Sequence, residues 1–344
     1  MSSASTPTPI TEARVQAIQT KLKALTGALN QVLFGQEKTV ELVVVALLAR
    51  GHVLLEGLPG LGKTELVKGL SKAIQLKQNR VQFTPDLLPG DITGNPVLQE
   101  SPTGERTFVF QKGPLFAELL LADEINRASP KTQSALLEAM QERSVSVFGT
   151  SHALPDPFFV FATQNPIELE GTYPLPEAQI DRFLFKLQME RGDRSVIEKI
   201  VQHRDLGGEV SVSQVMTRED LLEASSMTRE VFLPPEVVSY IARLVEATHA
   251  GMSQAASGVR FGCSPRAAIS LAASARARAL LNGRVYANFE DVQALASAAL
   301  QHRIVMDYQA KVEGISGESV VKMLLEEISP DGVEVPGSLK SAKL

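Results

Sequence analysis

The chain has 344 residues, of which 44% are hydrophobic and 21% are charged. This composition is typical of a globular protein and excludes a collagen-like or disordered chain, and the length predicts about two domains. The 34 Lys and Arg residues are balanced by 39 Asp and Glu residues, which leaves a net charge of −5. Proteins that bind nucleic acid without sequence preference usually carry a basic excess, so this class is disfavoured, although a local basic groove stays open.

Cysteine content and hydropathy bear on the cellular compartment. Cys263 is the only cysteine, which excludes an intrachain disulfide and favours a reducing compartment. The first residues contain neither a basic start nor an apolar run, so we see no secretory signal. The most apolar run, residues 42–49, is much shorter than the roughly 20 residues of a spanning helix. We therefore expect a cytoplasmic protein with no membrane span.

In chain order, the predicted elements alternate between helices and strands. We expect residues 1–11, rich in Ser, Thr and Pro, to form a disordered tail. Residues 12–49 carry apolar side chains at helical spacing and predict one or two helices. Amphipathic helices, predicted at 64–74 and 129–142, then alternate with short apolar runs that predict buried strands at 52–56, 80–83, 117–122, 158–163 and 185–189. Such alternation predicts a parallel sheet with helices on both faces.

Two segments interrupt this alternation. Residues 85–112 place two strand-like runs among Pro and Gly residues, and residues 144–154 predict a small hairpin. After Arg191 the remaining periodic segments are all helical. We predict four parts: the tail, an α/β core at 12–190 with the two insertions, a helical domain at 191–316, and a C-terminal segment at 317–344.

Residues 57–64 match the phosphate-binding loop pattern G-x-x-x-x-G-K-[ST] between a predicted strand and a predicted helix. Glycine allows backbone N–H groups to approach phosphate closely, and the positive end of the following helix dipole faces the same phosphates. Lys63 supplies a cation for the β and γ phosphates, and Thr64 supplies a hydroxyl for Mg²⁺. We therefore predict a nucleoside triphosphate site formed by Gly57, Pro59, Gly60, Leu61, Gly62, Lys63, Thr64 and Glu65.

Two further strands are predicted to end in polar residues. Asp123 and Glu124 follow the apolar run 119–122, where Asp123 would join the Mg²⁺ shell and Glu124 would polarise the attacking water. Asn165 closes the run that begins at residue 158, and its neutral amide would hold the lytic water and a γ-phosphate oxygen. Asn165 as a plain turn residue before Pro166 is the alternative.

These motifs and the segments around them resemble the AAA+ ATPases and, within them, the MoxR family. The resemblance covers about residues 35–316, departs mildly at Leu169 and Cys263, and rests on five segments: FTPDLLPGDITG at 83–94, DEINRA at 123–128, GTYPLPEAQIDRF at 171–183, GCSPRA at 262–267 and HRI at 302–304. It implies a P-loop AAA+ fold of the α/β class, in which a parallel sheet flanked by helices is followed by a smaller all-helical lid domain.

The resemblance also implies roles that spacing alone does not assign. Arg182 matches the arginine finger that enters the ATP site of the neighbouring subunit; a surface ion pair with Asp181 or a nearby acid is the alternative. Gly35 and Gln36, with Val32, resemble the motif that borders the adenine, although a simple helix end explains them nearly as well.

Arg266 matches the second sensor of the family, which reports the loss of the γ-phosphate. Ser264 is a good N-cap and Pro265 a good first-turn residue, so Arg266 is predicted in the first turn of a lid helix. The resemblance leaves open which subunit's ATP Arg266 contacts, and an ion pair within the lid is the alternative.

The resemblance implies a homo-oligomeric, hexameric ring that hydrolyses ATP with Mg²⁺. It further implies a chaperone-like machine that remodels or activates partner proteins, often proteins with von Willebrand factor A domains, through the two insertions. A nucleic-acid motor or loader is the alternative, which the absence of Lys and Arg from residues 144–154 disfavours. A nucleotide-gated scaffold that barely hydrolyses is disfavoured by Glu124 and Asn165.

Other chemistries find little support in the residues. The five histidines are scattered without metal-ligand spacing, and Cys263 is better explained as a small packing residue. Arg276, Arg278 and Arg284 could contact a polyanion, but a solvated helix face is the better interpretation.

Overall fold

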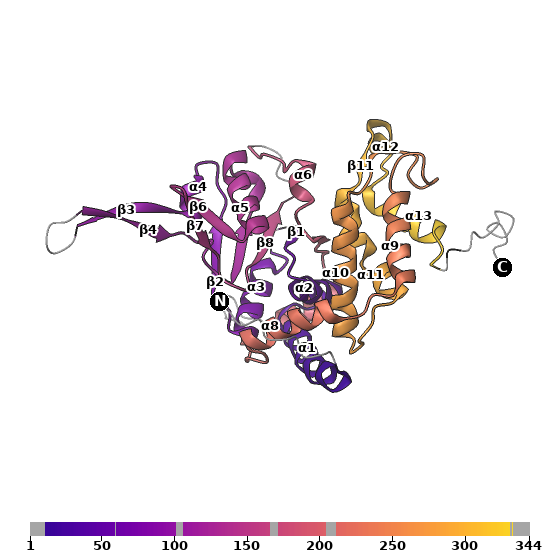
Figure 1. The fold of residues 1–344 in the computed structure, drawn as a ribbon, viewed down its shortest axis with the longest axis horizontal. Coiled ribbons are helices and arrows are strands. Elements are labelled where there is room, and N and C mark those ends of the chain that lie inside the picture. The colour runs from indigo at the N-terminus through magenta and orange to yellow at the C-terminus, as the bar shows by residue number, and fades with distance from the viewer. Residues whose placement is uncertain are drawn as a thin grey trace. The chain divides into compact units, whose positions relative to one another are not determined.

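The computed structural model describes residues 11–58, 60–100, 106–165, 171–203, 211–330 and 332. By packing, the chain forms two compact units (Figure 1). The sheet unit holds the described residues from Leu25 to Arg218, and the helical unit holds those up to Ala24 together with those from Glu219 onward. The domain boundaries set from the sequence stay predictions, because this division follows compactness and not chain order.

The sheet unit is built on five parallel strands in the order β2-β5-β8-β1-β9. Their bounds are β1 (Val53–Glu56), β2 (Gln78–Gln82), β5 (Leu119–Asp123), β8 (Phe159–Gln164) and β9 (Phe185–Gln188). The parallel sheet expected from the alternation is thus confirmed. The strand expected near residues 80–83 is present as β2 but is only partly buried. Val81 is buried within it and Phe83 directly after it, whereas the other residues of β2 are not, because the strand lies at the edge of the sheet.

The central strands are buried on both faces, so both faces of this sheet are covered. Leu54, Leu120 and Val160 pack into one core cluster with Leu136 and Leu137 of α5, while their neighbours along the strands are buried on the opposite face. Helix α3 contacts β5 and helix α2 contacts β9. The helices that end or lie in this unit are α1 (Glu12–Val32), which begins in the helical unit, α2 (Glu37–Leu48), α3 (Lys63–Ile74), α4 (Pro89–Thr93), η1 (Ile125–Arg127, a 3₁₀ turn), α5 (Pro130–Glu142), α6 (Glu177–Ile180) and α7 (Arg194–His203).

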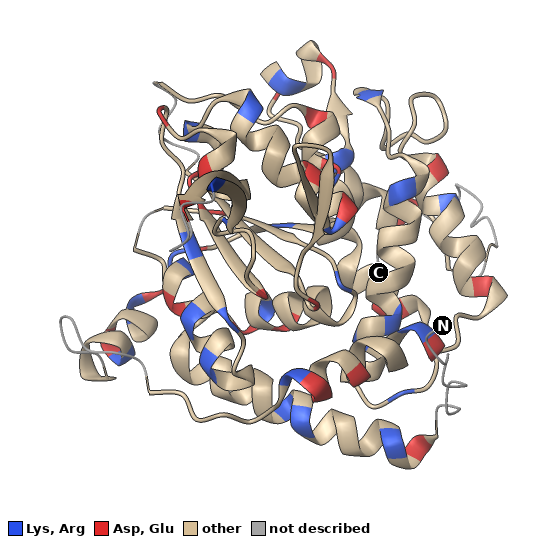
Figure 2. Ribbon diagram, turned by 60° about the vertical axis from the view of Figure 1, so that its left-hand side comes forward, with Lys and Arg blue, Asp and Glu red and all other residues tan. Residues whose placement is uncertain are grey.

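Charged residues of both signs are interspersed along the exposed helices. In the view of Figure 2, blue and red residues neighbour one another, and ion pairs such as Lys68–Glu65, Arg194–Glu198 and Lys322–Glu318 lie one helical turn apart. Such pairs stabilise a helix by about 0.2–0.5 kcal/mol each. Among the described residues seen in this view, the charges do not gather into the continuous basic stripe that nucleic-acid binding would favour.

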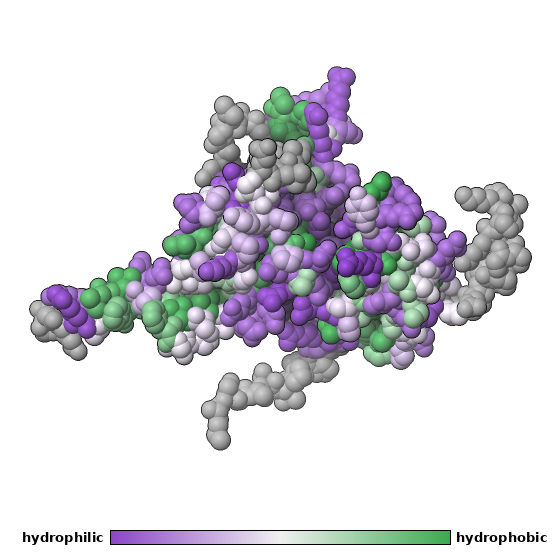
Figure 3. Space-filling model, turned by 90° about the horizontal axis from the view of Figure 1, so that it is seen from above, coloured by the Kyte–Doolittle hydropathy of each residue, from purple (hydrophilic) through white to green (hydrophobic). Residues whose placement is uncertain are grey.

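Both predicted insertions form antiparallel hairpins. Strands β3 (Gly94–Glu100) and β4 (Arg106–Lys112) make one, and β6 (Ser144–Val147) and β7 (Thr150–Ala153) make the other. The β3–β4 hairpin projects from its unit, and Leu98 and Phe108, which are paired across its strands, are 51% and 74% exposed. Figure 3 shows the resulting hydrophobic surface on the projecting hairpin.

The helical unit packs around α10 and α11, whose Leu271, Leu280 and Leu295 are buried. Its elements are α8 (Arg218–Glu230), α9 (Pro235–Ala247), β10 (Val259–Phe261), α10 (Pro265–Leu281), α11 (Phe289–Leu300), η2 (Gln301–Arg303), β11 (Val305–Met306), α12 (Tyr308–Val312) and α13 (Gly317–Glu327). The predicted helical domain therefore also contains a two-stranded antiparallel ribbon, β10 with β11.

An ion-pair cluster in the helical unit gives two of the arginines a structural role. Asp291, 0% exposed, accepts hydrogen bonds from Arg278 Nη1 at 2.9 Å and from Arg284 Nη2 at 2.6 Å. The Asp291 hydrogen bond is the main reason that the pKa of Arg284 is raised above its ordinary value. Arg278 and Arg284 are thus neither a polyanion contact nor a solvated face, because a buried carboxylate needs paired cations.

Two sequence expectations concern absences. Within the described ranges, no helix has the combination of length and apolar character that crossing a bilayer requires. The same residues contain no group of three or more His, Cys, Asp or Glu side chains able to hold a metal ion. Cys263 is 1% exposed, as expected for a packing residue.

Candidate functional site

A cavity of about 390 Å³ lies where the carboxyl ends of β1, β5 and β8 meet. Ligands of open parallel sheets bind at this edge, where chain connections leave in different directions. The phosphate-binding loop, between β1 and α3, contributes Gly57, Gly60, Gly62, Lys63, Thr64 and Glu65 to the lining. The rest of the lining comes from the other strands of the sheet, in the form of Arg80, Gln82, Asp123, Glu124, Thr163 and Asn165.

The loop adopts a backbone that needs glycine. Gly60 has φ +84° and Gly62 has φ +87°, both in the left-handed region that side-chain-bearing residues rarely adopt. A Cβ atom at Gly62 would lie 2.6 Å from Leu33 Cδ1, so the space is closed as well. Gly62 is also the N-cap of α3 and offers no side chain to the first N–H groups of that helix, which are free to bind an anion.

Lys63 is a partly desolvated cation that donates to backbone carbonyl oxygens. Its Nζ donates to the carbonyl oxygen of Gly57 and, at 3.4 Å, to that of Gln164. Among the described residues, no carboxylate lies within ion-pair distance of it. Burial lowers the pKa of Lys63, and the nearby Asp123 and Glu124 partly oppose this shift. Such an ammonium group suits a bound phosphate.

Asp123 is oriented by two residues that the sequence analysis did not single out. Thr163 Oγ1 donates to Asp123 Oδ1 at 2.6 Å, and Arg80 Nη2 donates to Asp123 Oδ2 at 2.7 Å. Thr163 gave a faint signal, since it is a polar residue at the end of an apolar strand. Arg80 gave none, because its proximity to Asp123 depends on β2 lying beside β5.

Glu124 lies directly after β5 in the left-handed region, with φ +56°. Thr163 Oγ1 accepts its N–H at 2.9 Å, so one hydroxyl contacts both acids. Its carboxylate accepts from Gln82 Nε2 at 2.8 Å and pairs with Arg127 Nη1 at 2.9 Å. Gln82 and Arg127 are further site residues that the sequence analysis missed. A non-glycine residue in this conformation is held by its surroundings, here by these three contacts.

Of the remaining residues predicted for the nucleotide site, those that the structure describes are not part of the cavity lining. Leu61 belongs to the loop but is not part of the cavity lining, and Pro59 lies outside the described residues. Gly35 follows α1 with φ +70°, and a Cβ atom there would lie 2.5 Å from Val196 Cγ2. Gln36 Nε2 donates to Glu190 O at 2.7 Å. Gly35 and Gln36 therefore join the turn after α1 to the segment that follows β9.

Arg182 lies at the opposite end of the sheet from the cavity. It precedes β9, whose register with β1 pairs Phe185 with Val53, whereas the phosphate-binding loop follows the other end of β1. The four residues of β9 span about 13 Å, which is longer than an extended arginine side chain. Within the described residues, no carboxylate lies within ion-pair distance of Arg182, so the alternative pair with Asp181 is not formed in this structure.

Arg266 belongs to the helical unit. It is exposed in the first turn of α10, behind Pro265 at the first helical position. Ser264 is the N-cap as predicted, but its side chain makes no cap hydrogen bond to the helix.

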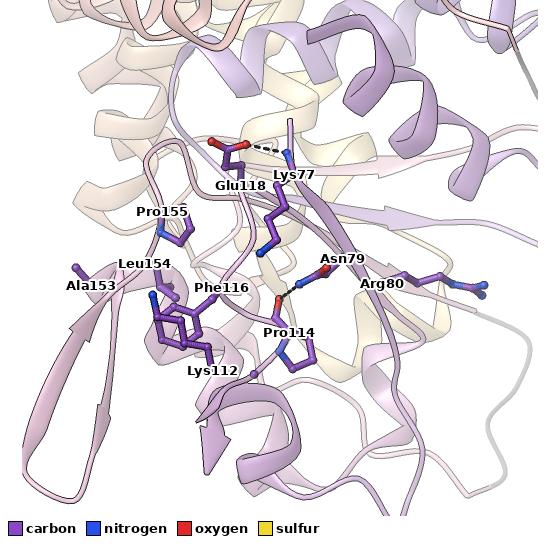
Figure 4. Close-up of a pocket in the computed structure, with 11 residues that line it drawn as sticks. Lys77, Asn79, Arg80, Lys112, Pro114, Phe116, Glu118, Ala153, Leu154 and Pro155 are labelled. Carbon is purple, nitrogen blue, oxygen red and sulfur yellow. Dashed lines mark hydrogen bonds between the residues drawn. The ribbon is translucent and has the colours of Figure 1, made fainter. Parts of the chain in front are cut away.

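A larger cavity, of about 700 Å³, lies along the free edge of β2 (Figure 4). Lys77 and Lys112 line it, and its acid, Glu118, already accepts from the backbone N–H of Lys77 and pairs with Arg218. Figure 4 shows Arg80 directed away from its centre. This cavity contains no glycine-rich loop at a helix N-terminus, so the smaller cavity is the better nucleotide site despite its size.

Comparisons with known proteins agree with this geometry. Residues 52–185 match the family model "ATPase family associated with various cellular activities (AAA)", and residues 252–324 match the model "AAA lid domain". The crystal structure of a protein from Cytophaga hutchinsonii that is assigned to the ATPases superposes with a TM-score of 0.85 at 37% sequence identity, covering 92% of this chain and 97% of that one.

Three relatives extend the similarity over most of the chain. The uncharacterized protein YeaC of Bacillus subtilis is 44% identical over 304 residues, which is 87% of this chain and 92% of YeaC. Chaperone MoxR1 of Mycobacterium tuberculosis is 42% identical over 87% of this chain and 80% of its own length. The MoxR protein of Methylorubrum extorquens is 31% identical over 86% and 88%.

The fold, the loop and the acids at the carboxyl edge of the sheet define a P-loop ATPase of the AAA class. The chain belongs to the MoxR family of AAA+ ATPases.

Proposed function

We propose that this protein hydrolyses ATP with Mg²⁺ between adjacent copies of the chain, and that the released energy remodels or activates partner proteins. One observation carries the proposal. The phosphate-binding loop, Asp123, Glu124 and Asn165 come from three separate strand ends and line one cavity. These are the groups that phosphate, metal and water need for phosphoryl transfer to water.

The residues present suit a nucleoside triphosphate. The backbone of the loop is free of Cβ atoms at Gly60 and Gly62, the first turn of α3 has no side-chain cap, and the Lys63 ammonium is desolvated. The glycines allow the backbone to approach a phosphate closely, and the uncapped N–H groups and the desolvated ammonium would gain partners from an anion. Gly35 and Gln36 are proposed to border the adenine.

The donor set also suits Mg²⁺, which prefers oxygen ligands and keeps several waters. Thr64 lines the cavity, and its hydroxyl has no hydrogen-bond partner among the described residues. Asp123 presents its carboxylate to the same cavity, already oriented by Thr163. When bound, the ion would neutralise charge that develops on the phosphates. Arg80 neutralises Asp123 in the structure and would have to share that carboxylate with the ion.

Glu124 is proposed to accept a proton from the attacking water, and Asn165 to orient that water against the γ-phosphate. Glu124 is tied to Gln82 and Arg127 in this structure. Because the Glu124 carboxylate is occupied by these two donors, one of the contacts has to loosen before a water can come within hydrogen-bond reach of it.

Arg182 is proposed to act on the nucleotide of a neighbouring copy. It lies beyond reach of its own loop and has no carboxylate within ion-pair distance among the described residues, as described above. A half-buried, unpaired guanidinium suits an approaching phosphate. A homo-oligomer follows, and a hexameric ring is what the family resemblance implies. Arg266 is proposed as the sensor of the γ-phosphate, in its own or the neighbouring copy.

The remodelling role rests on the family and on the hairpins. A relative is named Chaperone MoxR1, and the projecting β3–β4 hairpin exposes Leu98 and Phe108, which suits contact with other proteins. Partner proteins with von Willebrand factor A domains are proposed from the MoxR resemblance. The β6–β7 hairpin contains no Lys or Arg, which weakens the alternative of a nucleic-acid motor. The cytoplasmic location expected from the single cysteine stays a prediction.

Three variants test the nucleotide assignment. Lys63→Ala should abolish binding of a fluorescent ATP analogue, whereas Lys68→Ala, five residues further along α3, should bind it normally. Glu124→Gln should keep binding and reduce turnover by orders of magnitude. Normal binding by Lys63→Ala would refute the assignment of the loop, and unchanged turnover by Glu124→Gln would favour a scaffold.

Mixing of two inactive variants tests whether each ATP site is formed by two adjacent copies of the chain. Arg182→Ala subunits and Glu124→Gln subunits should each be inactive, but a mixture should recover part of the activity, since some interfaces then combine an intact acid with an intact arginine. Light scattering with ATP and Mg²⁺ should show a defined oligomer. A monomer under those conditions, or absence of recovery at every mixing ratio, would contradict action between copies.

A further inference from the structure

Gln133, in the first turn of α5, is a fully buried amide with an unusual set of partners. It is 0% exposed, and its Nε2 lies 2.8 Å from Tyr173 O and 3.2 Å from both Ile125 O and Ala128 O. An amide nitrogen carries two hydrogens, so the Tyr173 carbonyl takes one and the other two carbonyls share the second. One side chain thus binds two separate stretches of backbone.

These two stretches carry different parts of the proposed machinery. Ile125 and Ala128 bound the 3₁₀ turn that directly follows Glu124. Tyr173 lies in the segment that runs through α6 to Arg182. A second contact joins them, since the N–H of Tyr173 donates to Asn126 O at 2.6 Å. The turn after the acid and the segment before the arginine are therefore hydrogen-bonded to each other.

Packing transmits this attachment to Arg182. Leu175 and Phe183, on either side of α6, are buried in the same core cluster as Ile125 and Ala128. Arg182 directly precedes Phe183, and its N–H donates to Gln179 O at 3.2 Å. A shift of the Tyr173 segment would therefore move Arg182 with it, because close-packed interiors transmit displacement.

The polar character of residue 133 is costly at this position. Gln133 Oε1 is buried without a hydrogen-bond partner, as is Asn126 Oδ1 on the same turn. An apolar side chain of similar length would avoid that penalty, which amounts to about 1–3 kcal/mol for a buried unpaired group. Core packing alone does not explain an amide here, whereas a link between the two stretches does.

We propose that Gln133 is a positioning residue that ties the Arg182 segment to the turn after Glu124, so that the arginine offered to a neighbouring copy is placed by the acid turn of its own copy. This inference rests on the proposed function. Gln133 does not line the nucleotide cavity, and Glu124 is held separately by Gln82, Arg127 and Thr163. Loss of the Gln133 amide should therefore impair the neighbour's site and spare its own.

The test is the direction of complementation with Gln133→Met, which keeps the length of the side chain and removes its donors. Alone, this variant should bind the ATP analogue within about twofold of the wild type and turn over at least tenfold more slowly, since displacement of a catalytic group by about 1 Å costs on the order of 100-fold. Mixing it with Glu124→Gln subunits should restore activity. Mixing it with Arg182→Ala subunits should not, because both then lack a well-placed arginine.

Controls separate this inference from damage to the fold and from failure of the proposed function. Gln141→Leu, an exposed position on the same helix, should behave as wild type, and Gln133→Asn, which shortens the amide but keeps it, should show the same direction of rescue as Gln133→Met. The inference is overturned if the Arg182→Ala and Glu124→Gln mixture recovers activity but Gln133→Met behaves in any of three other ways. It could turn over ATP like the wild type, be rescued by Arg182→Ala subunits, or be rescued by neither partner. If that reference mixture fails to recover, the proposed function itself fails first.

Discussion

Thr163 carries two contacts at the site, which makes Thr163→Val a sharp perturbation. The hydroxyl donates to Asp123 Oδ1 at 2.6 Å and accepts the N–H of Glu124 at 2.9 Å, and the residue is 1% exposed. Valine has nearly the same shape, so the substitution removes both hydrogen bonds and leaves the packing of β8 intact. The loss is therefore electrostatic and not steric.

The expected magnitude follows from the two bonds. A hydrogen bond to a charged group contributes about 1.5–3 kcal/mol and a neutral one about 0.5–1.5 kcal/mol. Together, their loss should lower the free energy of unfolding of the sheet unit by about 2–4 kcal/mol and its melting temperature by on the order of 10 °C. Asp123 and the backbone of Glu124 would also lose their orientation, so the apparent affinity for Mg²⁺ and the turnover of ATP should both fall.

The assay is thermal unfolding without nucleotide, followed by ATP hydrolysis as a function of Mg²⁺ concentration. Thr163→Ser is the matched control, because it keeps both hydrogen bonds and loses a methyl group at a cost of about 1 kcal/mol. The valine variant should be clearly less stable than the serine variant. If it were equally stable or more stable, the argument that Thr163 orients the acids would be refuted.

Two further predictions concern buried ionisable groups. His52 accepts the N–H of Val160, and burial lowers its pKa to about 3, so between pH 6.5 and 3 the unfolded chain binds a proton that the folded chain does not. Lowering the pH from 7.0 to 5.5 should therefore remove about 1.2 kcal/mol of the free energy of unfolding through this group. In urea unfolding, the wild type should lose about this much more stability over that pH range than His52→Gln does. Parallel stability profiles against pH would contradict the prediction. Asp291→Asn should destabilise the helical unit by about 3–5 kcal/mol, because Arg278 and Arg284 lose their buried counter-charge. Glu290→Gln, at the exposed neighbouring position, is the control and should shift the urea midpoint little. Equal midpoints for the two variants would show that the cluster does not stabilise the unit.

Local patterns in the sequence predicted much of this protein. The spacing Gly57 to Thr64 defined the phosphate-binding loop, since it specifies backbone conformation and charge within eight consecutive residues. Apolar periodicity located the strands of the sheet and the helices α3 and α5 to within a few residues, because period and burial are tied to secondary structure. The acids at the end of β5 were found for the same reason: a polar pair that closes an apolar run lies at a strand end.

Contacts between distant residues could not be predicted in this way. Gln82 and Glu124 lie forty-two positions apart, and they meet because β2 is the neighbour of β5 in the strand order β2-β5-β8-β1-β9. The short strands of a parallel sheet resemble one another in composition, so their order is decided by how the connecting helices pack. The same holds for the pairing of Arg278 with Asp291, which sequence analysis read as a solvated face.

By itself, then, the sequence determined which residues carry charge and glycine freedom at the site, and which segments become strands and helices. Only the tertiary structure decided that Thr163 contacts both acids, that Arg80 neutralises Asp123, and that Gln133 joins the turn after Glu124 to the segment before Arg182. The physical reason is that local conformation depends on neighbours along the chain, whereas hydrogen bonds between segments depend on which surfaces the core brings together.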